Sequence, residues 1–251
     1  ESPFAQIRLN SLSGEAHRGP DDLGVDAIEI ANAKTLTNDR MQDLRDWFAL
    51  LNRGYKMMAV AASDSHAVNE IVGQARSYVV SSTDEPRKLQ IGEFCDNFLA
   101  GRFYASLGLL TLVEVNGKSR CGDLATETGP ELEVKITVLG PSWTKADRVA
   151  VYLNGQEARK ERIEGTGPGV KFQATWKFPA PRYDVNLVAV ASGPAVTAPY
   201  WPIAGGDKKY VMGATNPVWI DGDGDGKFTS AFEYASQVAQ AHGTSGAAVE
   251  E

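Results

Sequence analysis

The hydrophobic pattern of this chain changes near residue 109. Before that point, the short apolar runs 26–32 and 57–62 flank a segment whose apolar residues recur at helical spacing, namely Met41, Leu44, Trp47, Phe48 and Leu51. Gly54 then supplies a stop for the helix. Strand, helix and strand in this order predict a crossover connection, so the two strands should be parallel neighbours in a sheet.

From residue 109 onward the pattern is that of strands without helices. Apolar or alternating segments occupy residues 109–115, 132–139, 148–153, 170–178 and 183–191. Turn residues separate them, and Asn154-Gly155 is a strong hairpin signal because both residues tolerate positive φ. Strands at this spacing predict an antiparallel β-sandwich. Trp143, Trp176, Tyr200 and Trp201 are compatible with sugar binding, but aromatic residues in strands more often belong to the core.

One apolar run in the first part ends abruptly in polar residues. Residues 57–62 read as a buried strand, and Ser63-Asp64-Ser65-His66 follows at its carboxyl end. Asp64 and His66 are two residues apart, so an extended backbone directs both to the same face. A carboxylate and an imidazole that converge in this way bind Zn, Mn or Fe. The alternative is an Asx-turn at Asp64 beside a solvated histidine.

Segments on both sides of this motif point to a family. Residues 26–32, 47–54, 73–79 and 101–104, taken in order with Ser63-Asp64-Ser65-His66, resemble the PHP (polymerase and histidinol phosphatase) metallohydrolases. The similarity is to the carbaryl-hydrolase-like (CehA/McbA) branch, whose last metal motif reads Ser-Asp-Ser-His. It extends over residues 5–115 and returns at 215–228. The resemblance implies a (β/α) barrel whose metal activates water to hydrolyse ester, amide or phosphoester bonds.

The resemblance also assigns roles to individual residues. Asp64 and His66 would be metal ligands, and Glu29 a ligand or general base that lines the site. Asn32 and Arg76 would contact the substrate. From the sequence alone, Glu29 is equally a partner for a nearby arginine. Arg76 is likewise more simply interpreted as an ion-pair partner of Glu29 or Asp64 than as a substrate contact.

The chain departs from the family at its first metal motif. It contains 3 histidines, His17, His66 and His242, and no His-x-His. Asn10-Ser11-Leu12 stands where the family has Asn-His-Pro, and the loop residue His17 is either a substitute ligand or a solvated side chain. The pieces supply about three to four β/α units, fewer than a barrel needs.

We therefore expect an incomplete barrel segment with an incomplete metal site. This chain alone should bind transition metals weakly or not at all, because a tight site needs at least about three protein ligands. An upstream segment or another chain would complete the α/β part. The alternative function is a non-catalytic structural or interaction protein that kept the PHP-like fold and binds calcium.

The calcium assignment rests on residues 221–227, Asp-Gly-Asp-Gly-Asp-Gly-Lys. Carboxylates at alternate positions, with a glycine sixth and a carbonyl seventh, follow the ligand order of an EF-hand loop. The twelfth position is Phe232 rather than an acid, and Glu233 lies one residue later. This favours a looser, structural Ca²⁺ loop over a true EF-hand. Its expected ligands are Asp221, Asp223, Asp225, the Lys227 carbonyl and Glu233; the alternative is a solvated acidic turn.

Composition narrows the remaining choices. The chain has 251 residues and a formal net charge of −7, which argues against a nucleic-acid partner held by phosphate contacts. No stretch approaches the roughly 20 apolar residues that span a bilayer. Of the 2 cysteines, Cys95 falls on the apolar face of a helix expected to begin at Pro86, so a buried free thiol is the first expectation and a disulfide with Cys121 the second.

These patterns together predict an α/β plus all-β chain. Residues 1–108 would be the C-terminal part of a PHP-like α/β domain, with a strand at 4–10. Residues 109–214 would form the sandwich, 215–241 the calcium loop with a short helix, and 242–251 a flexible tail. Glu1 follows no signal-peptide pattern, which suggests a processed or truncated product, and we expect an extracytoplasmic location, periplasmic or secreted.

Overall fold

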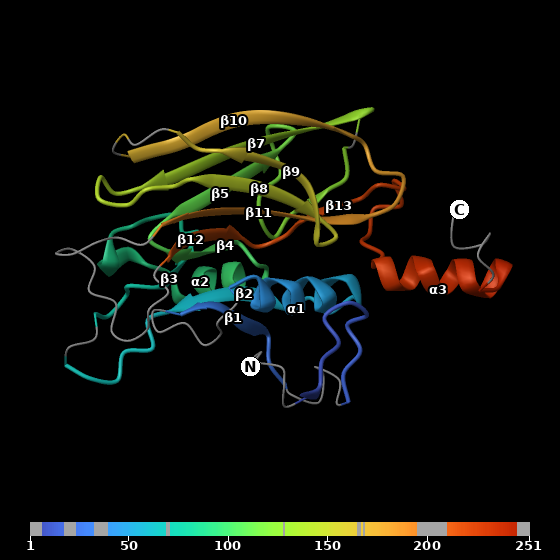
Figure 1. Cartoon of the computed structure of the whole chain (residues 1–251), viewed down its shortest axis with the longest axis horizontal. Coiled ribbons are helices and arrows are strands. Elements are labelled where there is room, and N and C mark those ends of the chain that lie inside the picture. Colours follow the sequence, from blue (N-terminus) through green and yellow to red (C-terminus); the bar gives the residue numbers. More distant parts are fainter. Residues whose placement is uncertain are drawn as a thin grey trace.

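The fold is known from a computed structural model that describes residues 7–17, 24–32, 40–68, 71–127, 129–164, 167, 169–194 and 210–244. Strands dominate it, and most of them pair antiparallel, which is compatible with the expected β-sandwich. Figure 1 shows the smaller sheet at the top, the larger sheet beneath it and a parallel strand pair with its helix below. No helix in the described residues is long and apolar enough to cross a membrane.

The strand-helix-strand unit forms as the hydrophobic pattern predicts. Strand β1 (Ala27–Asn32) pairs parallel with β2 (Met58–Ala62), and helix α1 (Arg40–Asn52) connects them. The apolar side of the helix is buried, and its Trp47 indole donates a hydrogen bond of 2.8 Å to the Met57 carbonyl next to β2. Gly54, at φ +100°, ends the helix by adopting a backbone conformation that other residues avoid.

The other edge of β2 is closed by side chains rather than by a further strand. The buried Asn216 amide accepts from the Ala59 N–H at 2.7 Å and donates to the Ala59 and Phe103 carbonyls at 3.2 and 3.0 Å. Ser77 does the same for Ala61, whose N–H and carbonyl it bonds at 3.0 and 3.1 Å. These bonds give the backbone N–H and carbonyl groups along this edge of β2 hydrogen-bond partners, and they join the strand to the sandwich.

The sandwich consists of a larger and a smaller sheet. In the larger sheet, β3, β4, β12, β11, β13 and β6 are neighbours in that order, and β8 and β9 pair beyond β11. In the smaller sheet the order is β10, β7, β5. The bounds of the larger sheet are β3 Arg76–Val79, β4 Phe103–Leu107, β6 Leu124–Ala125, β8 Arg148–Leu153, β9 Gln156–Arg162, β11 Val185–Pro194, β12 Tyr210–Thr215 and β13 Val218–Ile220. Those of the smaller sheet are β5 Leu110–Val115, β7 Glu131–Gly140 and β10 Gly169–Pro179.

The core lies between the two sheets. Alternate residues of β7 face it and are fully buried, whereas the residues between them face solvent. Gly213 of β12 marks the closest approach, since a Cβ there would lie 2.5 Å from the Leu109 carbonyl oxygen. The Thr111 hydroxyl donates to the Gly213 carbonyl at 2.9 Å across the interface. This glycine therefore allows the backbones of the two sheets to meet.

The predicted hairpin at residues 154–155 is confirmed. Asn154 and Gly155 both have positive φ, +47° and +75°, and they connect the antiparallel strands β8 and β9. A Cβ on Gly155 would lie 2.8 Å from the Cβ of Phe48 in α1, so this turn also packs against the helix of the α/β unit. The Phe48 ring lies 5.2 Å from that of Tyr152 at the same contact.

The expected series of β/α units is not found in the described residues. β1 and β2 pair in parallel through α1, and the other parallel strand pair of the described residues is the short contact of β13 with β6 inside the larger sheet. β3 and β4 pair antiparallel and join β12 in the larger sheet. The expected domain boundary at residue 108 would therefore separate β3 and β4 from β12, although all three strands belong to one sheet. Asn216 and Ser77 occupy the edge of β2 along which a parallel sheet would continue. No short helix follows His66 in the described residues, and residues 7–10 form no strand; residues 1–6 lie outside the described residues.

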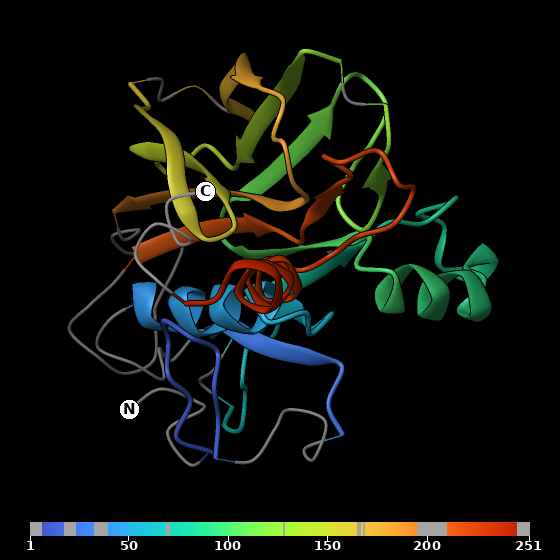
Figure 2. The ribbon, with the colours of Figure 1, turned by 90° about the vertical axis from the view of Figure 1, so that its right-hand side faces the viewer.

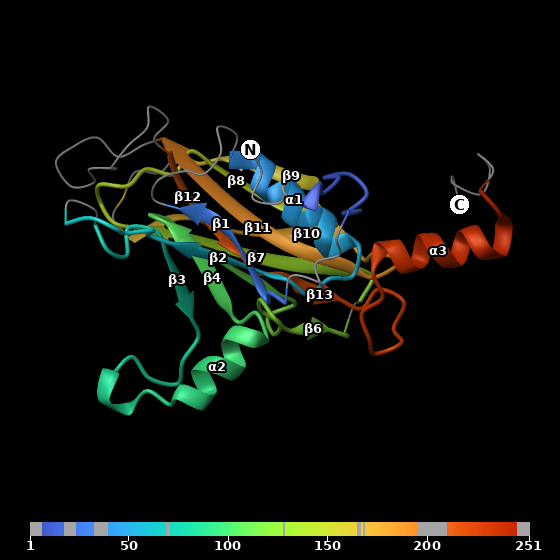
Figure 3. The same ribbon diagram turned by 90° about the horizontal axis from the view of Figure 1, so that it is seen from below.

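The helices differ from expectation in one respect. A short 3₁₀ helix covers Pro86–Lys88, and α2 begins separately at Ile91 and ends at Leu99. Figures 2 and 3 show α2 standing away from the body, and none of its residues is buried. Cys95 is consequently exposed, contrary to its expected burial, whereas Cys121 is a buried free thiol whose pKa is raised by burial to about 11. Helix α3 (Ala231–His242) forms near its predicted place, and most of the tail lies outside the described residues.

Candidate metal centre

The acidic loop begins directly after β13. The buried Asp221 carboxylate accepts hydrogen bonds from the Gly224 and Gly226 amides at 2.7 and 2.9 Å, one with each oxygen. Asp223 accepts from the Asp225 amide at 3.1 Å, and Asp225 from that of Lys227 at 2.8 Å. Each aspartate thus bonds the backbone a few residues ahead, and the loop curls around its own side chains.

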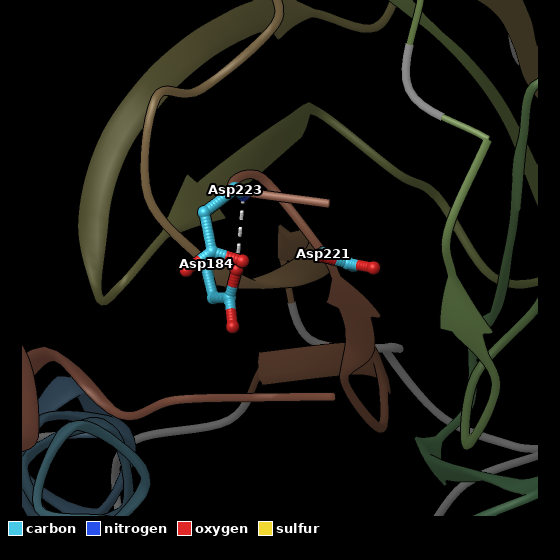
Figure 4. Close-up of side chains that lie close together, drawn as sticks. All are labelled: Asp184, Asp221 and Asp223. Carbon is cyan, nitrogen blue, oxygen red and sulfur yellow. Dashed lines mark hydrogen bonds between the residues drawn. The ribbon is translucent and has the colours of Figure 1, made fainter. Parts of the chain in front are cut away.

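A second strand end brings in an acid that the sequence motif does not contain. Asp184 precedes β11 and is 1% exposed. Its carboxylate accepts from the Gly222 amide at 2.8 Å, the Asp223 amide at 3.4 Å and the Thr229 amide at 2.6 Å. Ligand oxygens of Asp184, Asp221 and Asp223 all lie within 4.8 Å of one another. Figure 4 shows the three side chains and the hydrogen bond between Asp223 and Asp184. In the described part of the chain this is the one group of three acidic, histidine or cysteine side chains so close together.

The electrostatics of this group favour a cation. Carboxylates at this separation repel one another, and burial adds a large cost to each negative charge. The backbone amides offset part of this cost, but no lysine or arginine in the described residues forms an ion pair with Asp184 or Asp223. The Tyr234 hydroxyl donates to Asp223 at 2.7 Å, and burial together with this bond raises the pKa of Tyr234. A site built only from oxygen atoms suits Ca²⁺ or Mg²⁺ better than a softer metal.

Only some of the expected calcium ligands lie in this group of carboxylates. Asp221 and Asp223 belong to the group, and Asp184 takes a place that the sequence analysis did not foresee. The Asp225 carboxylate instead bonds the Lys227 amide. Glu233 forms a capping box at the start of α3, where its carboxylate accepts from the Ser230 amide and hydroxyl at 2.9 and 3.0 Å. The only local signal for Asp184 is a polar residue at the start of an otherwise apolar strand, which by itself is weak.

The Asp64–His66 pair lies beyond the carboxyl end of β2, as predicted. The His66 Nε2 atom is 2.5 Å from the Asp64 Oδ1 atom, and the His66 side chain is 73% exposed. Asp64 has φ +50°, a left-handed conformation that is unfavourable for a residue with a side chain. The backbone thus holds this carboxylate in a strained position at a strand end.

The neighbouring strand end carries the other expected residues. Asn32 is aligned with Ala62 in the parallel pair, and its amide donates to the Glu29 carboxylate at 2.7 Å. Within the described residues, Glu29 does not join Asp64 and His66 in a group of metal-ligand spacing. His17 is exposed in its loop. Ser11 donates to the buried Asp46 carboxylate at 2.5 Å instead of occupying a ligand position.

Arg76, the expected substrate contact, begins β3 and is exposed. The ion pair considered for it with Glu29 or Asp64 is absent from the part of the chain described. Its guanidinium carbon instead lies 5.9 Å from the centroid of the Tyr78 ring. Arg76 therefore remains able to meet an anion from solvent.

No protein-family model, no curated protein and no solved structure matches the chain.

Proposed function

We propose that this chain is part of a PHP-type metal-dependent hydrolase of ester, amide or phosphoester bonds. Asp64 and His66 would hold two ligand positions of a divalent transition metal such as Zn, Mn or Fe. A metal in such a position lowers the pKa of a bound water and so supplies the attacking hydroxide. Glu29 would act as the general base, and Asn32 would orient its carboxylate through their hydrogen bond.

One observation supports this proposal above the others. The Asp64 carboxylate and the His66 imidazole converge just beyond the carboxyl end of a buried parallel strand, and the Asp64 backbone is strained there. Functional side chains in α/β folds gather at that end of parallel strands. Residues held in such sparsely populated backbone conformations cluster at functional sites.

The site needs more ligands than these two residues. A tight transition-metal site uses at least about three protein ligands. In the described residues β1 has β2 as its one strand partner, and a two-stranded parallel sheet is too small to be stable alone. We propose that a further α/β segment, upstream or on another chain, extends this sheet and supplies the missing ligands.

Paramagnetic broadening by Mn²⁺ tests the metal assignment. Imidazole NMR signals of His66 should broaden at Mn²⁺ concentrations that leave His17 and His242 sharp. Asp64→Ala should abolish this preference, whereas the matched change Asp26→Asn, at the amino end of the same strand pair, should not. Equal broadening of all three histidines would refute a metal site at Asp64 and His66.

A second function, structural calcium binding, is favoured by the convergence of Asp184 with the acidic loop. This is the alternative in which the chain is a non-catalytic structural or interaction protein, and the exposure of His66 and the serine at position 11 agree with it. Ca²⁺ would take oxygens of Asp184, Asp221 and Asp223, with the Lys227 carbonyl, Asp225 or water completing the usual six to eight ligands. The ion would fasten the segment after β13 to the start of β11.

Thermal unfolding with and without a chelator tests this second function. Ca²⁺ at about 100 times its dissociation constant should stabilise the fold by about 2.7 kcal/mol, because only the folded loop binds it. Asp184→Asn and Asp223→Ala should each remove the response to Ca²⁺, while Asp96→Asn on α2 should leave it intact. A chelator that changes none of these melting curves would show that the loop is only an acidic turn.

A further inference from the structure

A groove that the proposed metal chemistry does not use lies between the two sheets of the sandwich. It has a volume of about 440 Å³, within the range of small-molecule sites. One wall comes from β3 and β4 through Arg76, Tyr78 and Ser106. The other comes from the ends of β7 and β10 through Gly140 and Gly169, and Trp143 lies in the loop after β7.

The groove carries positive charge, although the chain as a whole is negatively charged. The protein has a formal net charge of −7, yet no aspartate or glutamate lines the groove. Arg76 supplies a guanidinium that forms no ion pair within the described residues, so its donors remain available for a planar anion.

A buried lysine adds positive charge behind the groove wall. Lys171 is 4% exposed and donates to the Gly167 carbonyl at 2.7 Å. Its Cε atom lies 3.2 Å from the position that a Cβ on Gly140 would take, so the lysine stem runs beside this wall of the groove. No carboxylate in the described part of the chain pairs with it, and burial lowers its pKa. An anion in the groove would favour the charged form of this lysine.

The groove also presents flat apolar surfaces. Tyr78 and Trp143 line it while 41% and 48% exposed, unlike the buried Trp47, Trp176 and Trp219. Exposed aromatic faces beside an arginine are suited to stack on a ring while the guanidinium holds an acidic substituent. On the opposite wall, Gly140 and Gly169 add no side chain, and the apolar side chains of Leu110 and Leu139 contribute to the lining.

We propose that this groove binds a small carboxylate carried on a flat ring. The carboxylate pairs with Arg76, and the ring lies against Trp143 and Tyr78. The ring belongs either to an aromatic acid or to a sugar acid, since both present a flat apolar face. This binding does not depend on a metal at Asp64 and His66.

Titrations followed by the Trp143 indole NMR signal test the proposal. Benzoate and glucuronate each combine a ring with a carboxylate, benzyl alcohol has the ring alone, and acetate the charge alone. We expect a ring carboxylate to shift the Trp143 signal at concentrations where acetate and benzyl alcohol do not. Tighter binding of glucuronate assigns a sugar acid and tighter binding of benzoate an aromatic acid; either result supports the proposal.

Variants separate the two contributions. Arg76→Gln should weaken binding of the ring carboxylate about tenfold or more, as expected for a lost charge-assisted pair. Trp143→Ala, for which binding is followed through the NMR signals of the ligand's own ring protons, should also weaken it. Both residues are exposed, so the fold should persist. The control Arg87→Gln, in the 3₁₀ helix outside the groove, should bind like the unchanged protein. The proposal is overturned if Arg76→Gln binds normally, or if no ring carboxylate shifts Trp143 at about 10 mM, roughly ten times a millimolar dissociation constant.

Discussion

The acidic loop and the Asp64–His66 pair carry similar chemistry but are held in different ways. Asp184 and Asp221 are buried, and both oxygens of each carboxylate accept at least one backbone amide of residues 222–229. His66 is largely exposed, and its contact with Asp64 spans two residues of one loop. Residue types alone indicate that a metal could bind at either place. Hydrogen bonds from the backbone decide whether the side chains are held in position to bind it.

The largest expected effect concerns the strand that carries Asp64. Asn216→Ala removes the amide that closes the edge of β2, leaves the buried N–H and carbonyl of Ala59 without this partner and takes one donor from the Phe103 carbonyl. Urea unfolding should show a loss on the order of 3 kcal/mol. Ser77→Ala, which removes a half-buried hydroxyl from the same edge, should cost only about 1 kcal/mol. Equal losses would mean that the edge is held by packing and not by these hydrogen bonds.

A smaller effect is expected from the backbone of the acidic loop. A Cβ on Gly222 would lie 2.3 Å from the Tyr183 carbonyl oxygen, next to Asp184. Gly222→Ala should therefore destabilise the fold by about 2 kcal/mol and remove the response to Ca²⁺. Gly224→Ala meets no atom within 4 Å and bears only the strain of its φ of +79°, about 1 kcal/mol. Differential scanning calorimetry with and without Ca²⁺ compares the two variants. If Gly222→Ala still responded to Ca²⁺, Asp184 would not be a ligand of the ion.

The smallest effect belongs to the exposed pair. His66→Ala should change the free energy of unfolding by less than about 0.5 kcal/mol, because the side chain is mostly solvated. The same denaturant titration measures it against the unchanged protein. A loss above about 1 kcal/mol would show that His66 supports the fold and would weaken its assignment as a ligand.

Local patterns predicted the elements that depend on local geometry. The helical spacing of Leu44 and Trp47 identified α1, and positive φ at Asn154 and Gly155 was foreseeable from their residue types. The amphipathic period of α2 likewise identified a helix. Its apolar side nevertheless stays exposed, because periodicity shows which face is apolar and not what covers it.

Partnerships between distant segments were not predictable. Asp184 bonds Gly222 across 38 residues, and Asn216 bonds Ala59 across 157. Neither residue stands in a motif, because a side chain that satisfies a remote backbone group needs only the right position. The antiparallel pairing of β3 with β4 is of the same kind, since one strand sequence is compatible with several partners.

The side-chain bridge at β2 has a consequence for how the molecule opens. In a sheet, an amide exchanges with solvent only when a neighbouring strand separates, so protection is shared along the ladder. The Ala59 amide is protected by one side chain, and Asn216 stands between β12 and β13, next to the segment that leads into the acidic loop. Hydrogen exchange at Ala59 should therefore follow the local opening of that distant segment, and a ligand that fastens residues 221–229 should slow it.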